Sequence, residues 1–151
     1  MADYFGPDRA SAMAAHLVRF AESFGVRGFA PRDWISNTRK ALAVAELARD
    51  RGRLHPLRHA VMEAYWRGGR DIEDDAVLSD CAREAGLDPA GALAAIGDPA
   101  YRARVDAMGD EARRVGVTGI PTFVMGHRGV VGCQPYEVLA ALAEAEGAAR
   151  R

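Results

Sequence analysis

The sequence predicts a mostly helical α/β protein, in which a series of helices is followed by a short β-hairpin and a last helix. Through most of the chain, apolar residues recur every three or four positions, as they do on one face of a helix. The period changes only near the C-terminus, where two short apolar runs flank Gly126, His127 and Arg128. We therefore expect a single hairpin, with strands at about 122–125 and 129–132.

The first two helices are expected at residues 9–24 and 38–51. Asp8 can cap the first of them, and Gly25 stands where a helix C-terminus usually has its glycine. Ser36 or Asn37 begins the second, and Gly52 ends it. The expected inward residues are Met13, Leu17, Phe20 and Phe24 in the first helix, and Leu42, Ala45, Leu47 and Ala48 in the second.

Four more helices are expected before the hairpin. Pro56 lies in the first turn of one that runs to about residue 66, with Leu57, Val61, Met62 and Tyr65 inward. The acidic stretch at 71–75 offers N-caps for a helix that runs to residue 85. Asp88 and Pro89 open a short helix that ends near residue 97, and Pro99 begins a long one that stops at Gly116.

Proline residues mark the start of the hairpin and of the last helix. Pro121 has no N–H group, so it fits the first residue of a strand or a turn, and we expect the Ile120–Pro121 peptide bond to be cis. Pro135 opens a helix at 136–146, with Val138, Leu139 and Leu142 on one face. Because a lone hairpin is marginal in water, we expect missing upstream residues, another chain or covering helices to complete the sheet.

Composition narrows the class of protein. A chain of 151 residues with 49% hydrophobic content can bury a real core but is too short for two ordinary domains. The net charge of −1 gives no reason to expect nucleic acid or an anionic membrane as partner. No apolar run approaches the roughly 18 residues of a membrane span, and the N-terminus does not resemble a signal peptide. We expect a cytoplasmic protein with two reduced cysteines.

Four segments together resemble the DsbA family in its FrnE-like branch, which is related to 2-hydroxychromene-2-carboxylate isomerases and kappa-class glutathione transferases. The segments are SNTRKAL at 36–42, AYWRGGRDI at 64–72, GVTGIPTFV at 116–124 and GCQPYE at 132–137. The resemblance implies an incomplete thioredoxin-like fold: a helical insertion domain at 1–98, then the C-terminal part of the thioredoxin-like domain at 99–151. The family's first strand–helix–strand unit, with its Cys-x-x-Cys or Ser, has no counterpart here, so we expect a truncated form.

The resemblance implies a thiol–disulfide oxidoreductase that is inactive in this form, because the expected nucleophile is absent. Two alternatives stay open: a glutathione-dependent isomerase or transferase, and a noncatalytic helical binding or assembly module. By resemblance, a thiol or disulfide peptide, or glutathione, would be bound near Asn37, Gly119, Ile120, Pro121 and Gln134. We expect no metal and no other cofactor, and a homo-oligomer is one way to complete the sheet.

Other candidate residues favour structural roles. Cys81 fits a buried helix position, whereas Cys133 precedes a helix N-terminus, where the helix dipole favours a thiolate by about 0.3–1 kcal/mol. His55 and His59 have the spacing of two metal ligands, but no third ligand follows them. We expect Arg70 and Asp71 to fix a loop, with Asp71 capping a helix, and Trp34 and Trp66 to serve in packing.

Overall fold

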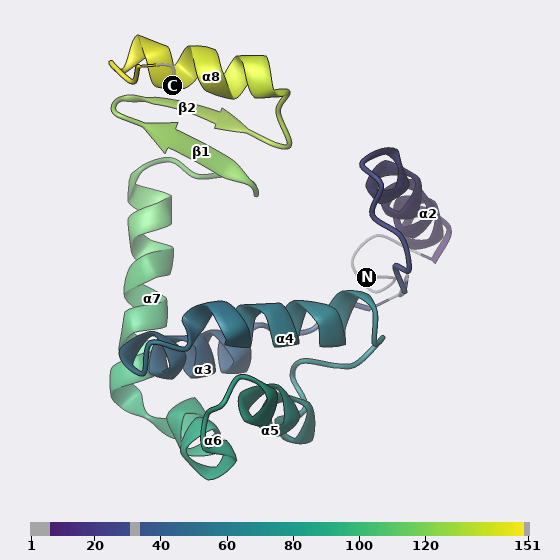
Figure 1. Cartoon of the computed structure of the whole chain (residues 1–151), viewed down its shortest axis with the longest axis vertical. Helices are drawn as coiled ribbons and strands as arrows, with labels where there is room; N and C mark the ends of the chain where they lie inside the picture. Colours follow the sequence, from purple (N-terminus) through teal and green to yellow (C-terminus); the bar gives the residue numbers. More distant parts are fainter. Residues whose placement is uncertain (1–6, 31–33, 150–151) are drawn as a thin grey trace. The chain divides into compact units, whose positions relative to one another are not determined.

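The computed structural model describes residues 7–30 and 34–149, with side chains from residue 11 onward. Within these ranges the helices are α2 (Pro7–Ser23), α3 (Arg39–Asp50), α4 (Leu54–Trp66), α5 (Asp75–Glu84), α6 (Pro89–Gly97), α7 (Pro99–Arg114) and α8 (Tyr136–Ala145), and the strands are β1 (Thr122–Met125) and β2 (Arg128–Val131) (Figure 1). The chain divides into two compact units, Met1–Asp106 and Ala107–Arg151. The predicted order of helices, hairpin and last helix is confirmed. The expected capping by Asp8 lies outside the described side chains.

The starts of α5 and α6 are fixed by aspartate caps. The Asp74 carboxylate accepts a hydrogen bond from the Ala76 N–H at 2.8 Å. The Asp88 carboxylate accepts one from the Gly91 N–H at 2.9 Å. Both bonds satisfy N–H groups that have no partner within the helix, so these two acidic residues set where the helices begin.

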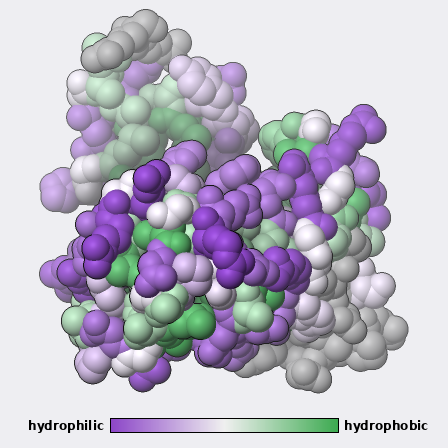
Figure 2. Space-filling model, turned by 60° about the horizontal axis from the view of Figure 1, so that its bottom comes forward, coloured by the Kyte–Doolittle hydropathy of each residue, from purple (hydrophilic) through white to green (hydrophobic). Residues whose placement is uncertain are grey.

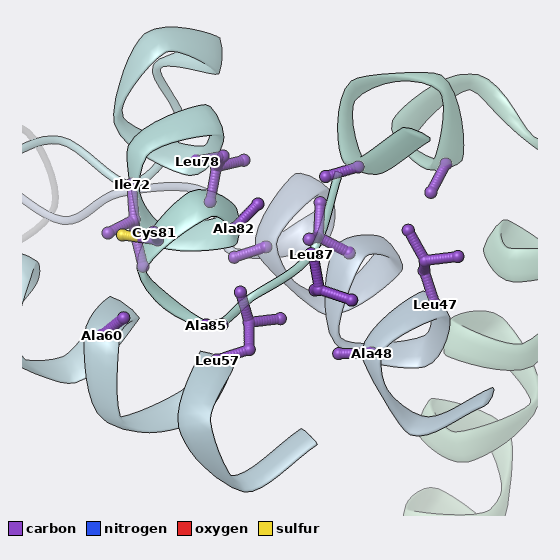
Figure 3. Close-up of a cluster of buried hydrophobic side chains, with 14 of the residues drawn as sticks. Leu47, Ala48, Leu57, Ala60, Ile72, Leu78, Cys81, Ala82, Ala85 and Leu87 are labelled. Atoms are coloured by element: carbon purple, nitrogen blue, oxygen red, sulfur yellow. The ribbon is translucent and has the colours of Figure 1, made fainter. Parts of the chain in front are cut away.

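The core of the first unit is built from α3, α4, α5 and α6. Leu78 and Leu57 are among the largest fully buried side chains, and Figure 3 shows both within one apolar cluster. Small residues, chiefly alanine, supply much of the remaining contact surface and allow the helices to approach closely. The buried cluster consists of Ala41, Val44, Leu47, Ala48, Leu57, Ala60, Ile72, Val77, Leu78, Cys81, Ala82, Ala85, Leu87, Ala92 and Ala95.

Several residues that were expected to face inward are exposed. Leu42 is 41% exposed and Met62 is 52% exposed, whereas Val44 is fully buried. The apolar side of α2 is also open, and its exposed side chains are Met13, Leu17 and Phe20, followed by Phe24 just after the helix. Burial depends on which face of a helix meets another element, and the spacing of apolar residues does not specify this. Figure 2 shows hydrophilic side chains over most of the view, with apolar patches between them.

The second unit contains the antiparallel pair β1–β2. Thr122 pairs with Val131 and Met125 pairs with Arg128, so the loop consists of Gly126 and His127 alone. The second strand therefore begins at Arg128, one residue earlier than predicted. Gly126 has a φ of +57°, and a glycine with positive φ at the first position of a two-residue loop is typical of a type II′ hairpin.

Helix α8 packs against β1 through the partly buried side of the hairpin, and its Leu142 is buried. Figure 1 shows α8 running alongside the two strands. On the strands themselves, Val124 is 52% exposed and Val131 is 49% exposed. The hairpin is therefore covered by α8 while these two apolar side chains stay open to solvent.

Across the described ranges, none of the helices combines the length and the hydropathy that crossing a membrane requires.

Candidate functional site

Residues Gly119, Ile120 and Pro121 form a bend between α7 and β1. The hydroxyl of Thr122 donates a hydrogen bond to the Gly119 carbonyl oxygen at 2.5 Å, which fixes the bend from its C-terminal side. The Ile120–Pro121 peptide bond is cis. The Ile120 side chain is 92% exposed, the highest value among the exposed large apolar side chains. An apolar side chain held in this position is available to contact a ligand.

A second connection joins this bend to the turn after β2. The Gly132 N–H donates to the Pro121 carbonyl oxygen at 2.7 Å. Within the turn, the Gln134 side-chain amide donates to the Val131 carbonyl oxygen at 2.6 Å. The structure thus brings together four of the five predicted site residues, Gly119, Ile120, Pro121 and Gln134, with Cys133 in the same turn.

The backbone of Ile120 has unused hydrogen-bonding groups. Among the hydrogen bonds of the described residues, none involves the Ile120 N–H or C=O group. An exposed N–H and C=O next to the start of a strand can pair with an extended peptide, as in ligand recognition by strand addition. The chemistry that the bend offers is therefore binding, since it contains no nucleophile or titratable group.

Asn37 lies in the first unit, in the loop before α3. Its side-chain oxygen accepts a hydrogen bond from the Arg39 N–H at 3.0 Å, and its own N–H donates to the Glu73 carboxylate at 3.3 Å. The buried Ser36 hydroxyl donates to Asp71 at 2.7 Å and so ties this loop to the one before α5. Asn37 itself is exposed.

Asp71 fixes a loop, as predicted, but it does not cap a helix. Its carboxylate accepts hydrogen bonds from Ser36 and from the Glu73 N–H, the latter at 3.0 Å, whereas Asp74 caps α5. The helix begins at Asp75, which leaves Asp71 too far upstream to reach the first free N–H groups. Arg70 pairs with Asp80 at 2.6 Å, and this hydrogen bond lowers the pKa of the Asp80 carboxyl below its usual value.

The two cysteines are free and differ in environment. Cys81 is buried, with 2% of its surface exposed, and burial raises the pKa of its thiol above the usual value. Figure 3 shows its sulfur among the apolar side chains of the core. Cys133 is exposed in the turn before α8. A thiol with a raised pKa is a poor nucleophile, so Cys81 fits the structural role that was expected of it.

We expect iodoacetamide at neutral pH to label Cys133 in the native protein and to leave Cys81 unlabelled, because only Cys133 is accessible to the reagent. Peptide mass spectrometry measures both sites, and Cys81 should react only after unfolding in urea. In the Cys133→Ser variant the rapid adduct should disappear. Rapid labelling of Cys81 in the native state would contradict its burial.

The remaining candidates show packing rather than ligand binding. The Trp66 ring lies 5.0 Å from the Phe29 ring and the Trp34 ring 6.3 Å from the Tyr65 ring, measured between centroids. His55 and His59 are exposed on α4. Among the residues that the structure describes, no group of three or more His, Cys, Asp or Glu side chains is placed to hold a metal ion.

Thr122 was not among the predicted site residues, although its hydroxyl anchors the bend. The sequence signal that could have identified it is its place directly after the proline. A hydroxyl in this position can reach back to a carbonyl three residues earlier, as serine and threonine side chains commonly do in turns.

Comparison with known proteins identifies the family. The model of the DSBA-like thioredoxin domain family matches residues 2–143, and the chain belongs to this family. It is similar to a probable DsbA oxidoreductase from Streptomyces coelicolor at 34% identity and a TM-score of 0.80, over 95% of this chain and 63% of that one.

A candidate protein disulfide isomerase from Nitrosomonas europaea has the same fold, at 19% identity and a TM-score of 0.74, over 92% of this chain and 74% of that one. A search of curated proteins gives no match. The chain thus spans less than two thirds of the length of the Streptomyces coelicolor protein.

Proposed function

We propose that this chain carries the substrate-binding half of a thiol–disulfide oxidoreductase site and that the 151-residue chain does not itself catalyse thiol–disulfide exchange. The ligand would be an extended peptide with a thiol or disulfide, bound at Gly119, Ile120, Pro121 and Gln134. The single observation that carries the proposal is the bend before β1, where the exposed Ile120 has a free N–H and C=O group. Membership of the DSBA-like thioredoxin domain family supports this choice of ligand.

Two hydrogen bonds anchor the backbone of the bend on either side of Ile120. The Thr122 hydroxyl and the Gly132 N–H anchor the carbonyl groups on either side of Ile120. A preorganised backbone loses less conformational entropy on binding, which favours recognition of an extended peptide through its main chain. Substrate side chains would then add specificity through contact with the exposed Ile120.

The proposed lack of catalysis follows from the cysteines. Thiol–disulfide exchange starts with attack by a thiolate on a disulfide sulfur, so it requires an accessible thiol of low pKa. The sequence has two cysteines, and they lie about fifty residues apart rather than in a Cys-x-x-Cys motif. Cys81 is buried with a raised pKa, and Cys133 has no second cysteine in its turn to resolve a mixed disulfide.

The purified chain should leave the rate of insulin reduction by dithiothreitol unchanged. Turbidity of the precipitating insulin B chain measures the rate, with a Cys-x-x-Cys enzyme as positive control. The Cys133→Ser variant should behave identically to the parent chain. Acceleration by the parent chain that is lost in this variant would overturn the proposed lack of catalysis.

Peptide binding is tested separately by amide NMR shifts. An extended peptide with S-methylated cysteine should shift the Gly119, Ile120 and Gln134 signals. The Ile120→Ala variant, which keeps the backbone N–H, should still bind, whereas Ile120→Pro should not. Unchanged β1–β2 signals in both variants show that the hairpin is intact.

Glutathione in place of the peptide tests the alternative ligand. Saturable shifts with glutathione and none with the peptide would favour the glutathione-dependent class. No shifts with either ligand would favour a noncatalytic binding or assembly module.

A further inference from the structure

A cavity of about 330 Å³ lies in the first unit, beside the start of α3 and next to α6 and α7. Its apolar wall is formed by Ile96 and by Val105, which is 9% exposed. The polar lining consists of Asn37, Arg39, Lys40, Glu73 and Arg102. None of these polar residues belongs to the buried apolar cluster, and three of the five are cations.

Two of the three cations already have acidic partners. Arg39 pairs with Asp106 at 2.6 Å and Lys40 pairs with Asp75 at 2.7 Å. The Lys40–Asp75 hydrogen bond raises the pKa of the Lys40 ammonium group above its usual value. These two residues contribute local positive charge but are not fully available to a ligand.

Arg102 is the cation that remains available. Its Nε–H donates to the Ile96 carbonyl oxygen at 2.9 Å, which fixes the position of the guanidinium group. Its two terminal nitrogens form no ion pair within the described part of the chain. A planar guanidinium with free terminal N–H groups is suited to binding a carboxylate or phosphate through two parallel hydrogen bonds.

The lining contains one acidic residue, Glu73, and its carboxylate is bonded within the lining itself. The Glu73 carboxylate accepts a hydrogen bond from the Asn37 N–H at 3.3 Å. The adjoining first turn of α3 contains no acidic residue, and Thr38 forms no side-chain cap. An anion in the cavity would lie near the positive end of α3 and the three cations, which together oppose the one Glu73 carboxylate of the lining.

We propose that this cavity binds a small oxyanion, a carboxylate or phosphate group, with Arg102 as its main contact and Arg39 and Lys40 as supporting charges. The apolar wall of Ile96 and Val105 would contact the rest of a ligand that carries such a group. This proposal rests on residues of the first unit, whereas the proposed peptide site rests on the bend at Ile120 in the second, so the two proposals can fail separately.

The test is titration of the full chain with sodium phosphate and, in a second series, sodium acetate, at an ionic strength held constant with sodium chloride. The backbone amide signals of Arg39, Lys40 and Arg102, and the guanidinium signals of the two arginines, should shift and saturate. Saturation with phosphate, with acetate or with both supports the site and identifies the oxyanion. No saturable shift in either series would overturn the proposal.

Variants locate the binding site. Arg102→Gln should weaken binding about tenfold or more, because a hydrogen-bonded charge pair is lost. Arg102→Lys keeps the charge but not the paired N–H groups. The affinity of this variant for the oxyanion should therefore lie between those of the parent chain and Arg102→Gln. Arg58→Gln, the same change on α4 outside the cavity, should bind like the parent chain. If Arg102→Gln and Arg58→Gln weaken oxyanion binding equally, the attraction is non-specific and the proposal is wrong.

Discussion

Replacing Leu78 with alanine is expected to lower the free energy of unfolding of the first unit by about 2–5 kcal/mol. Leu78 lies on α5, is completely buried and belongs to the apolar cluster that joins α5 to its neighbours. Truncation loses the favourable free energy of transferring the removed atoms from water into the core. It also leaves a cavity that closely packed alanines cannot fill without moving the helices. A loss of this size is a large part of the stability of a small unit.

Tryptophan fluorescence in urea measures this effect in the full chain. Both tryptophans of the sequence, Trp34 and Trp66, lie in the first unit, so the signal reports that unit alone. Leu93→Ala on α6 is the matched control, because it removes the same atoms from a residue that is 36% exposed. It should lower the free energy of unfolding clearly less than Leu78→Ala does. Equal losses in the two variants would contradict the assignment of Leu78 to the core.

Replacing Gly126 with alanine is expected to destabilise the hairpin of the second unit by about 1–2 kcal/mol, the cost of a left-handed backbone for a residue with a Cβ. Gly126 has a φ of +57°, and an added Cβ would also collide with the Glu146 carboxylate. Glu146 pairs with Arg128 at 3.4 Å, so moving its side chain weakens a link between the end of α8 and β2.

The second unit has no tryptophan, so fluorescence does not report on it. Hydrogen exchange of the paired β1–β2 amides measures the stability of the hairpin instead. Exchange in Gly126→Ala should be about 5–30 times faster than in the parent chain if the amides exchange through opening of the hairpin. Gly129→Ala is the control in the same hairpin. A Cβ there would lie 3.4 Å from the Phe123 carbonyl oxygen, in ordinary contact and without a positive φ. Exchange that is equally fast in both variants would argue against a special role for Gly126.

Local signals in the sequence predicted the elements well. The caps and breaks act within one turn of helix, so Asp88 with Pro89 opens α6, and Gly116 follows the end of α7. The strand at 122–125 was also predicted correctly. The start of β2 was one residue off, because the loop length depends on the backbone angles of Gly126 and His127, and these are not specified by composition.

Burial could not be predicted as well, since it depends on contacts between distant segments. Leu42 and Met62 have the spacing of core residues but lie exposed, whereas the charged Glu46 is 5% exposed and pairs with Arg49 at 3.1 Å. For the candidate site, the resemblance named five residues, of which the structure brings Gly119, Ile120, Pro121 and Gln134 together, whereas Asn37 belongs to the first unit. The Gly132–Pro121 hydrogen bond extends the predicted hairpin by one position, whereas the cavity at Arg102 joins residues from 37 to 105, and no local pattern predicts it.

The bend at residues 119–121 has anchors that all come from its own hairpin: the Thr122 hydroxyl, the Gly132 N–H and the register of β1 with β2. None of these three anchors is a side chain of the first unit. Substitutions in α3 to α6 are therefore expected to leave these three anchors unchanged.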